Sequence, residues 1–528
     1  MRANGIDVAG QLALQAIANG TAHPSVLNLA AQAKFRTGQI SEAIVLLRQA
    51  EALDPTDPNI LNSLAICLQS QGDGLAALDA YNRALAMAPA LAAAQCNRAG
   101  LLKELGDING ARAAYVRTIE LDPHHADALA GLAWLEAEAG NGDAAEALAK
   151  RALSVAPQHV LGRLAAAAAA LQRRDFVAAE AIALPLVQDG NLSPVNRAIA
   201  LGLAGDILDA RGETPQAFAA YSASNAMLKA VNEVRYEAPG FESALAQADR
   251  LAEWFAATNT AQWRDAPRHD PDSGDPSTHV FLVGFPRSGT TLLENVLAAH
   301  PQVVSLEERD PLAAATADYL TSNDGLERLA QIDVAEAEQQ RQAYWLAVRG
   351  AGIEPAGKVF IDKMPLASVQ LPLVAKLFPT ARILFARRDP RDVVVSCFRR
   401  RFGMNPAMYE LLTLEGAAAF YDAVMRLSAV YRQALDLPQQ IVRYERLVED
   451  FEATARAACD FLGLEWHADM VDFAAKARAR GVATPSAAQV AKGLNREGQG
   501  VWLRYRDQLA PVLPTLEPWV REFRYEAS

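Results

Sequence analysis

Cysteine is scarce in this sequence, with four among 528 residues. The four are Cys67, Cys96, Cys397 and Cys459. They lie far apart and show none of the spacings that zinc ligands adopt. Thiols this few and this scattered are typical of a reducing compartment and argue against a disulfide framework. We therefore expect neither disulfides nor a metal site.

A long hydrophobic run is also missing. The N-terminal stretch carries Asp7 and Gln11, where a signal peptide would be continuously apolar. The richest apolar stretch, residues 164–171, is mostly alanine and is followed within two residues by a charged cluster that begins at Arg173. The sequence therefore predicts a cytoplasmic protein with no membrane partner.

The chain has no excess of basic residues, because its net charge is −12. This balance argues against a nucleic-acid partner held by general electrostatics, while it leaves room for a local anion pocket. Hydrophobic residues make up 51%, as in ordinary globular proteins, and the length indicates roughly two to four domains. The alanine-rich usage hints at a bacterial source.

The first half of the chain repeats with a period of 34 residues. Three columns share this step in one register: Pro55, Pro89, Pro123 and Pro157; Gly38, Gly72, Gly106 and Gly140; Ala43, Ala77, Ala111 and Ala145. Glycine tolerates the left-handed conformation that ends a helix, and proline cannot continue one. Alanine lets two helices approach closely. Each copy is therefore expected to form two antiparallel helices.

This pattern resembles the tetratricopeptide repeat, which has the same period. A fifth copy is degenerate, with Arg174 in place of the glycine and Ala179 in the alanine column, and Gly212 and Ala217 mark a further helical pair. The resemblance implies a right-handed superhelix over roughly residues 20–235. Its groove is expected to bind a peptide or to pack against a neighbouring domain. The alternative is that the array only stabilises or dimerises the protein.

The composition changes after the repeats. Residues 264–278 are rich in Asp, Pro, Ser and Gly and lack an apolar period, so they indicate a linker or loop. We therefore predict three segments: helical repeats at 1–240, a helical segment and linker at 241–277, and a second domain at 278–528.

An anion-binding loop opens the second domain. A short apolar run at residues 280–284 has strand character, a glycine-bounded loop follows, and helical spacing resumes after Thr291. The loop amides expected to face a phosphate are those of Ser288, Gly289, Thr290 and Thr291. Thr290 occupies the position of the lysine that contacts the γ-phosphate in nucleotide triphosphatases. Arg287 lies inside the loop, where its guanidinium can neutralise charge on a leaving phosphate.

A second basic motif lies about a hundred residues further on, at the end of another strand-like run. Arg388 follows this run, and Ser396 lies eight residues later on an expected helix. Arg388 can hold a phosphate with paired donors, and the Ser396 hydroxyl adds a neutral one. Arg400 falls at i+4 from Ser396, so it is expected to face the same anion.

These two motifs resemble those of the sulfotransferase family. Residues 286–291 resemble its 5′-phosphosulfate loop, and Arg388 with Ser396 resembles its 3′-phosphate motif. The resemblance implies 3′-phosphoadenosine-5′-phosphosulfate (PAPS) as the co-substrate, with no metal. Strands expected near residues 280, 359 and 383 each precede a helix. The predicted fold class is an all-α tetratricopeptide superhelix followed by an α/β P-loop-like domain with a central parallel sheet.

Within that family, the run from Arg287 through His300 to Glu308 resembles protein-tyrosine sulfotransferases in its spacing. This resemblance implies that Glu308 is the general base and that Arg287 stabilises the leaving phosphate. It also implies roles for four further residues. Lys363 is the catalytic lysine, and Tyr444 lies near the adenine. Ser486 supports the transition state, and Lys492, in the same C-terminal motif, contacts PAPS.

Two departures bear on the acceptor. Val501 stands where the family has a lysine before the tryptophan that corresponds to Trp502. The eukaryotic tyrosine enzymes are membrane-anchored and carry disulfides, and this chain shows neither. The sequence therefore predicts sulfuryl transfer to a hydroxyl, with protein tyrosine as the first acceptor. A glycan, lipid or small-molecule hydroxyl is the alternative, and a peptide-binding scaffold with an inactive enzyme domain is the alternative of another class.

Overall fold

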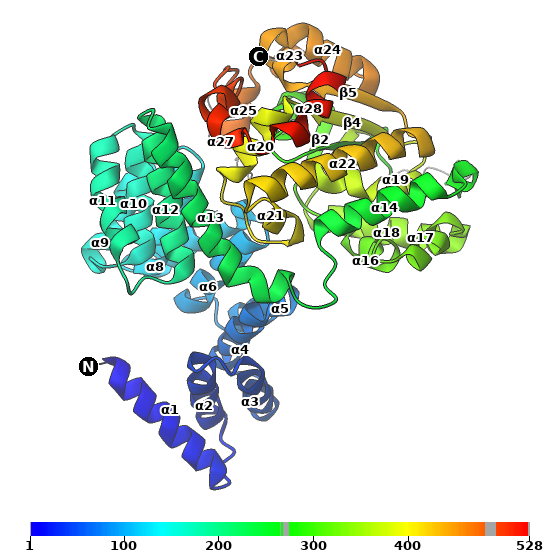
Figure 1. Ribbon diagram of the computed structural model, residues 1–528. Helices are drawn as coiled ribbons and strands as arrows, with labels where there is room; N and C mark the ends of the chain where they lie inside the picture. The colour runs from blue at the N-terminus through cyan, green and yellow to red at the C-terminus, as the bar shows by residue number, and fades with distance from the viewer. Residues whose placement is uncertain (1, 264–265, 268–273, 481–492, 526–528) are drawn as a thin grey trace. The chain divides into compact units, whose positions relative to one another are not determined.

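A computed structural model describes residues 2–263, 266–267, 274–480 and 493–525 (Figure 1). The chain divides into two compact units. The first unit comprises Met1–Ala137 and Asn141–Ala169, and the second comprises Glu138–Gly140 and Ala170–Ser528. The segment boundaries predicted at residues 240 and 278 stay predictions. They mark changes in sequence composition, whereas the two units are defined by how densely their residues pack.

The first part of the chain is a succession of helical hairpins. Its helices are α1 (Arg2–Ala18), α2 (Pro24–Arg36), α3 (Ile40–Leu53), α4 (Pro58–Gln71), α5 (Gly74–Met87), α6 (Ala92–Glu104), α7 (Ile108–Leu121), α8 (Ala126–Glu138), α9 (Gly142–Val155) and α10 (Val160–Gln172). Helices α3, α5, α7 and α9 each end two residues before a proline of the predicted column. The predicted helical repeats are confirmed.

The glycine column adopts the backbone conformation that its residue type favours. Gly72, the C-cap of α4, has a φ of +95°. Arg174 stands in the same column and also has a positive φ, of +62°. A non-glycine residue rarely adopts this conformation. Packing of the hairpin therefore imposes the turn even where the sequence has lost its glycine.

Five helical segments follow: α11 (Phe176–Gln188), α12 (Pro194–Ala210), α13 (Thr214–Tyr236), α14 (Ala244–Ala257) and the 3-10 helix η1 (Thr260–Trp263). The alanine column continues with Ala179 in α11 and Ala217 in α13, and both are fully buried. The α12–α13 hairpin confirms the helical pair predicted from Gly212 and Ala217. It belongs to the same compact unit as the sheet.

The second unit is built around a five-stranded parallel sheet. Its strands are β1 (Thr278–Gly284), β2 (Val303–Glu307), β3 (Val359–Lys363), β4 (Arg382–Arg387) and β5 (Gln439–Arg443), in the order β2-β3-β1-β4-β5. The expected parallel sheet is confirmed. β2 and β5 are short strands that the apolar pattern did not reveal.

Helices cover both faces of this sheet. Successive residues of β1 alternate between two hydrophobic clusters: Val280 and Leu282 belong to one, and Phe281 and Val283 to the other. This alternation is the period of a strand that is buried on both sides. One face packs against α15 (Thr290–Ala298) and α24 (Phe451–Leu462).

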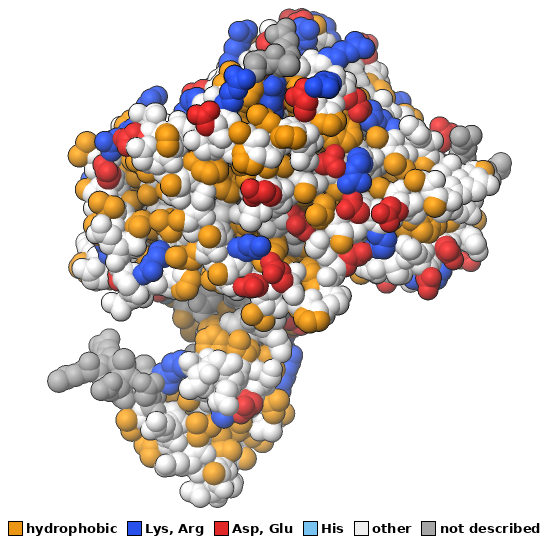
Figure 2. Space-filling view, viewed as in Figure 1, with side chains coloured by type: hydrophobic (Ala, Val, Ile, Leu, Met, Phe, Trp, Pro, Cys, Tyr) orange, Lys and Arg blue, Asp and Glu red, His pale blue; other side chains and the backbone are white. Residues whose placement is uncertain are grey.

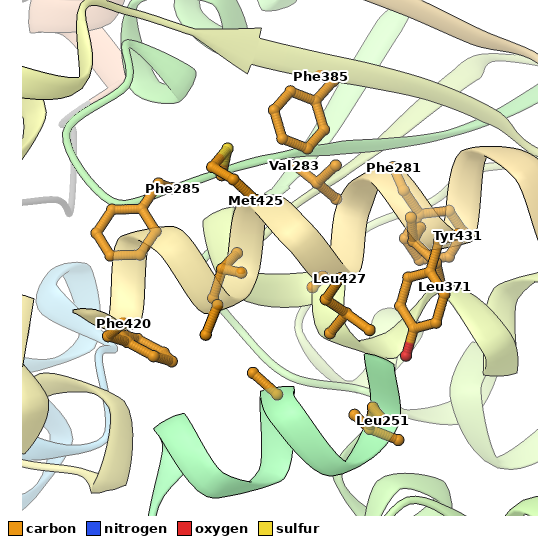
Figure 3. Close-up of a cluster of buried hydrophobic side chains, with 14 of the residues drawn as sticks. Leu251, Phe281, Val283, Phe285, Leu371, Phe385, Phe420, Met425, Leu427 and Tyr431 are labelled. Atoms are coloured by element: carbon orange, nitrogen blue, oxygen red, sulfur yellow. The ribbon is translucent and has the colours of Figure 1, made fainter. Parts of the chain in front are cut away.

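The other face packs against α14 and α22 (Leu414–Ala434), which contact each other along the sheet (Figure 1). Figure 3 shows Phe281 and Phe385 among the buried side chains on this side, in the same cluster as Met425 and Leu427 of α22. The remaining helices are α16 (Ala313–Tyr319), α17 (Asn323–Ala330), α18 (Val334–Gly350), η2 (Pro365–Gln370), α19 (Leu371–Leu377), α20 (Pro390–Phe398), α21 (Pro406–Glu410), α23 (Tyr444–Glu449), η3 (Ala468–Met470), α25 (Phe473–Arg480), η4 (Val501–Tyr505), α27 (Arg506–Leu509) and α28 (Leu513–Glu522).

Charge is mixed on the surface. On the face seen in Figure 2, acidic and basic side chains are interspersed over much of the area. All four cysteines are free and buried. Among the helices of the described residues, none combines the length and the apolar character that a membrane-spanning helix requires.

A buried polar chain lies under the sheet. The Nε2 atom of His279 lies 2.9 Å from the Tyr344 hydroxyl, which donates a hydrogen bond of 2.7 Å to Oδ2 of Asp362. Burial lowers the pKa of His279 to about 3. Burial likewise raises the pKa of Asp362 to about 7, against a partial lowering by the Tyr344 hydrogen bond. Both groups are therefore neutral in the folded protein at mildly acidic pH.

His279 and Asp362 make the free energy of unfolding depend on pH in opposite directions. The folded pKa of Asp362 lies above its unfolded value, so its contribution is lost as the pH rises toward about 7. Relative to the parent, Asp362→Asn is therefore expected to gain about 1.4 kcal/mol of unfolding free energy per pH unit between about pH 4 and 7. His279→Gln is the control of opposite sign, because its unfolded state binds the extra proton. Urea unfolding at several pH values measures both, and equal slopes for the two variants would contradict this account.

Candidate functional site

The phosphate loop and the end of β4 emerge side by side at the carboxyl edge of the sheet. Gly284, the last residue of β1, is in register with Ala386 of β4. A Cβ atom at Gly284 would lie 2.5 Å from the carbonyl oxygen of Ala386. At the other end of the loop, Gly289 caps α15 with a φ of +97°, and a Cβ there would lie 2.8 Å from the ring of Tyr444. Both positions therefore require glycine.

The loop amides are used unequally. Ser288 donates its amide to the carbonyl oxygen of Phe285 at 3.1 Å, so this amide closes the turn. Thr290 and Thr291 begin α15, where backbone amides have no acceptor within the helix. Of the four amides predicted to face an anion, those of Gly289, Thr290 and Thr291 therefore remain candidates, and that of Ser288 does not. Ser288, Thr290 and Thr291 are all buried.

The two predicted motifs meet at Arg287. Its Nε donates a hydrogen bond of 3.0 Å to Oγ of Ser396, which lies 109 residues away in the sequence. Arg287 has a φ of +68°, in the left-handed region that a non-glycine residue seldom adopts. Strain of this kind is retained where the surrounding structure holds a side chain in a particular direction.

Arg388 joins the loop to the end of β4. It is buried, and its guanidinium donates a hydrogen bond of 2.9 Å to the carbonyl oxygen of Arg287 and a second to that of Gly498. The same guanidinium lies 4.9 Å from the centre of the Tyr444 ring, at the end of β5. The residues predicted to hold the 3′-phosphate and the adenine are therefore neighbours.

Arg400 was expected on the same helix as Ser396, but it lies just beyond the end of that helix. α20 ends at Phe398, so Arg400 lies in the turn beyond the helix rather than at i+4 within it. Its Nε is buried without a hydrogen-bond partner among the described residues. Burial, followed by the charges of Arg400 and Arg388, lowers the pKa of Arg287 to about 9. Three cations held this close together would be stabilised by a polyanion.

The flanking arginines are not a solvated patch. Arg399 forms an ion pair with Asp209, and Arg401 lies 2.7 Å from Asp206. The two carboxylates are i and i+3 on α12, which belongs to the helical hairpin before the sheet. The sequence reading missed this pairing, although two aspartates on one helix face were a visible signal. Arg400 lies between them in the sequence, and the charges of Asp206 and Glu138 partly offset the lowering of its pKa by burial.

Asp209 has more than one partner. Besides its ion pair with Arg399, it accepts a hydrogen bond of 2.6 Å from the Tyr505 hydroxyl. Asp209→Ala is expected to destabilise the second unit by about 2–4 kcal/mol, because it leaves the buried Tyr505 hydroxyl and the partly buried Arg399 guanidinium without this carboxylate. Glu452→Gln, which breaks the exposed pair with Arg456, is the control and should cost less than about 1 kcal/mol. Urea unfolding of the full chain compares them. Equal losses would show that Asp209 is a surface group in solution.

Glu308 and Lys363 meet at the ends of neighbouring strands. Glu307 of β2 is in register with Lys363 of β3, and the amide of Glu308 donates to the Lys363 carbonyl oxygen at 2.9 Å. Nζ of Lys363 lies 2.7 Å from Oε1 of Glu308. The Lys363 side chain is fully buried, whereas that of Glu308 is 34% exposed. Glu308 has a φ of +36°, so it is strained as Arg287 is.

A second carboxylate faces Lys363 that the sequence reading did not single out. Oε2 of Glu294, in α15, lies 3.4 Å from Nζ of Lys363, and both side chains are fully buried. Oε1 of Glu294 accepts a hydrogen bond of 2.9 Å from Ser305 of β2. The available signal was a glutamate that follows two leucines in a helix whose side chains are mostly buried.

Two predicted residues, Ser486 and Lys492, lie outside the described residues. Asn495, three residues after Lys492, is described, and its side-chain amide donates to the Gly493 carbonyl oxygen at 3.0 Å. In the part of the chain that the structure describes, no three His, Cys, Asp or Glu side chains gather as metal ligands would.

The structure thus defines a helical-repeat protein with an α/β domain that gathers arginines, a phosphate loop and a lysine–glutamate pair at one sheet edge. Residues 279–468 match the model of the sulfotransferase family. Residues 102–167 and 31–72 match models of the tetratricopeptide repeat. The C-terminal domain therefore carries a match to the sulfotransferase family, and it follows a region that matches tetratricopeptide repeats.

Several known proteins and solved structures are similar to part of this chain. Protein-tyrosine sulfotransferase 1 of Danio rerio is 30% identical over 195 residues, which are 36% of this chain and 54% of the relative. An uncharacterised protein of Aquifex aeolicus is 27% identical over 257 residues, 46% of this chain and 33% of the relative. The chain thus spans between a third and about half of these relatives. The sulfotransferase domain of the Synechococcus PCC 7002 olefin synthase aligns at 22% identity with a TM-score of 0.32, covering 49% of this chain and 99% of that domain.

Proposed function

We propose that this protein transfers a sulfuryl group from PAPS to a hydroxyl, with protein tyrosine as the first acceptor to test. The observation that carries the proposal is the convergence of the two arginine motifs: Arg287 donates a hydrogen bond to Ser396, and Arg388 donates one to the carbonyl oxygen of Arg287. Burial, followed by the charges of Arg400 and Arg388, lowers the pKa of Arg287. A ligand with phosphate at both its 5′ and 3′ positions would place negative charge beside these three arginines. The match of residues 279–468 to the sulfotransferase family supports the same donor.

In the proposed site, the donor's two charged ends have separate partners. Gly289, Thr290 and Thr291, with Arg287, hold the 5′-phosphosulfate. Arg388, Ser396 and Arg400 hold the 3′-phosphate, and Tyr444 lies beside the adenine. Lys492 is proposed as a further donor contact. The Arg287–Ser396 hydrogen bond supports this arrangement, because it links the two groups directly.

PAPS supplies the sulfuryl group, whose bond to the bridging oxygen breaks as the acceptor oxygen bonds to sulfur. Glu308 takes the proton of the acceptor hydroxyl; its partial exposure supports this role, since an acceptor must reach it. Lys363 and Arg287 stabilise the negative charge that stays with the phosphate. Ser486 is proposed to assist them. No metal is required in this scheme.

The acceptor is proposed from the protein-tyrosine sulfotransferases among the relatives, one of which is 30% identical. A tyrosine hydroxyl has a pKa of about 10, so one carboxylate is a reasonable base for it. The tetratricopeptide repeats add a candidate dock for a protein acceptor, because such arrays commonly bind peptides. Glycans and small hydroxyl compounds are the alternative acceptors.

The test is sulfuryl transfer from radiolabelled PAPS to tyrosine peptides, a glycan panel and small phenols. Label on tyrosine peptides is the expected result. Label on glycans or small compounds alone would keep the donor and overturn the acceptor. PAPS binding without transfer to any acceptor would favour a scaffold, and absence of PAPS binding would overturn the proposal.

A further inference from the structure

Lys363 has two carboxylate partners where the proposed chemistry needs one. Glu308 follows β2, lies 2.7 Å from Nζ and is partly exposed. Glu294 comes from α15, the helix that the phosphate loop begins, and lies 3.4 Å from Nζ with no exposed surface. Ser305 of β2 holds the other oxygen of Glu294 at 2.9 Å. One carboxylate is therefore accessible, and the other is fixed inside the domain.

The two roles proposed for the Glu308–Lys363 pair conflict if they have only each other. When Glu308 accepts a proton, it loses the charge that balances the Lys363 ammonium. A fully buried ammonium without a counter-ion tends to lose its proton, because burial disfavours the charged form. Lys363 would then become neutral at the moment when the leaving phosphate needs a cation.

We propose that Glu294 is a positioning residue, the fixed counter-ion that keeps Lys363 charged and in place while Glu308 acts as the base. This inference rests on the proposed function. Glu294 cannot itself reach an acceptor, since it is fully buried. Its proposed effect on the reaction is transmitted by the charge of Lys363.

The charged groups around Lys363 agree with this assignment. Glu294 faces it from α15, Glu307 and Glu308 face it from the β2 side, and Asp362 precedes it in β3. Burial by itself lowers the pKa of Lys363, but Glu294 and then Glu308 raise it above its ordinary value. Glu294 contributes the larger charge effect of the two. Glu308 acts through its charge and also through its hydrogen bond, and the charge of Glu294 remains when a proton neutralises Glu308.

The test is Glu294→Gln, which keeps an oxygen for Ser305 and removes only the charge. The kcat for sulfuryl transfer is expected to fall about 10- to 100-fold, with donor affinity unchanged. The rate should also decline at a lower alkaline pH than in the parent, because Lys363 now loses its proton earlier. In a Lys363→Arg background this shift should disappear, since arginine stays protonated.

A second measurement does not depend on turnover. Lysine labelled with carbon-13 at Cε reports the titration of Lys363 by NMR, and Glu294→Gln should lower the titration midpoint by about one pH unit or more. If Glu294→Gln does not fold, Ser305→Ala frees the same carboxylate and should produce a smaller shift in the same direction.

An unchanged titration of Lys363, or an unchanged kcat and pH profile in an active enzyme, overturns the role of Glu294. A parent enzyme with no transfer activity overturns the proposed function instead. In that case the titration still decides whether Glu294 holds the charge of Lys363. The two failures are therefore distinguishable.

Discussion

Replacing Glu308 by glutamine is expected to lower the kcat for sulfuryl transfer by about 10²- to 10⁴-fold, the usual contribution of a general base. Glutamine fills the same space and can still accept a hydrogen bond from Lys363, which lies 2.7 Å from the carboxylate. What it loses is the ability to take the acceptor proton. Donor affinity should be unchanged, because the donor's phosphates are assigned to Arg287, Arg388 and Arg400.

Steady-state kinetics with labelled PAPS and a saturating acceptor measures this loss. Glu327→Gln is the matched control, since it removes a carboxylate exposed on α17 of the same unit. It should leave the kcat at the parent value. A Glu308→Gln enzyme with full activity would remove Glu308 from the mechanism, and a loss confined to donor binding would make it a donor contact.

Replacing Arg388 by alanine is expected to weaken binding of adenosine 3′,5′-bisphosphate about 10- to 150-fold, the effect of losing charge-assisted hydrogen bonds. The bisphosphate is the desulfated product of PAPS and keeps the 3′-phosphate. Binding of adenosine 5′-phosphate, which lacks that group, should change much less. Isothermal titration calorimetry with both ligands measures the difference.

The comparison of the two ligands matters because Arg388 also supports the loop. It donates hydrogen bonds to the carbonyl oxygens of Arg287 and Gly498. An equal loss for both ligands would mean that Arg388 acts by shaping the loop and does not contact the 3′-phosphate. Arg456→Ala, an exposed arginine on α24, is the control for a general loss of positive charge. It should bind both ligands as the parent does.

Much of the fold could be predicted because it depends on local rules. The helix ends follow from the glycine and proline columns, which act within one turn of the chain. The strands at β1, β3 and β4 are apolar and lead into helices, so their pattern is visible. β2 and β5 escaped notice because each is five residues long and only partly buried.

The candidate site could be predicted in part for the same reason. The loop around Arg287 and the strand end at Arg388 are contiguous motifs, and the sequence reading identified both. Glu308 and Lys363 came from the family resemblance rather than from their spacing. Glu294 and Asp209 were missed, because their importance depends on partners that are distant in the chain.

The sequence by itself determined the repeat period, the phosphate loop and the residue types available for anion binding, since each depends on neighbours within a few residues. Only the tertiary structure decided which charges pair. Asp206 and Asp209 of α12 neutralise Arg401 and Arg399, while the charge of Arg400 acts on Arg287. Glu294 and Glu308 flank Lys363 in the same way. Electrostatic energy falls with distance in space and is independent of separation along the chain, so these pairings exist only in the folded protein.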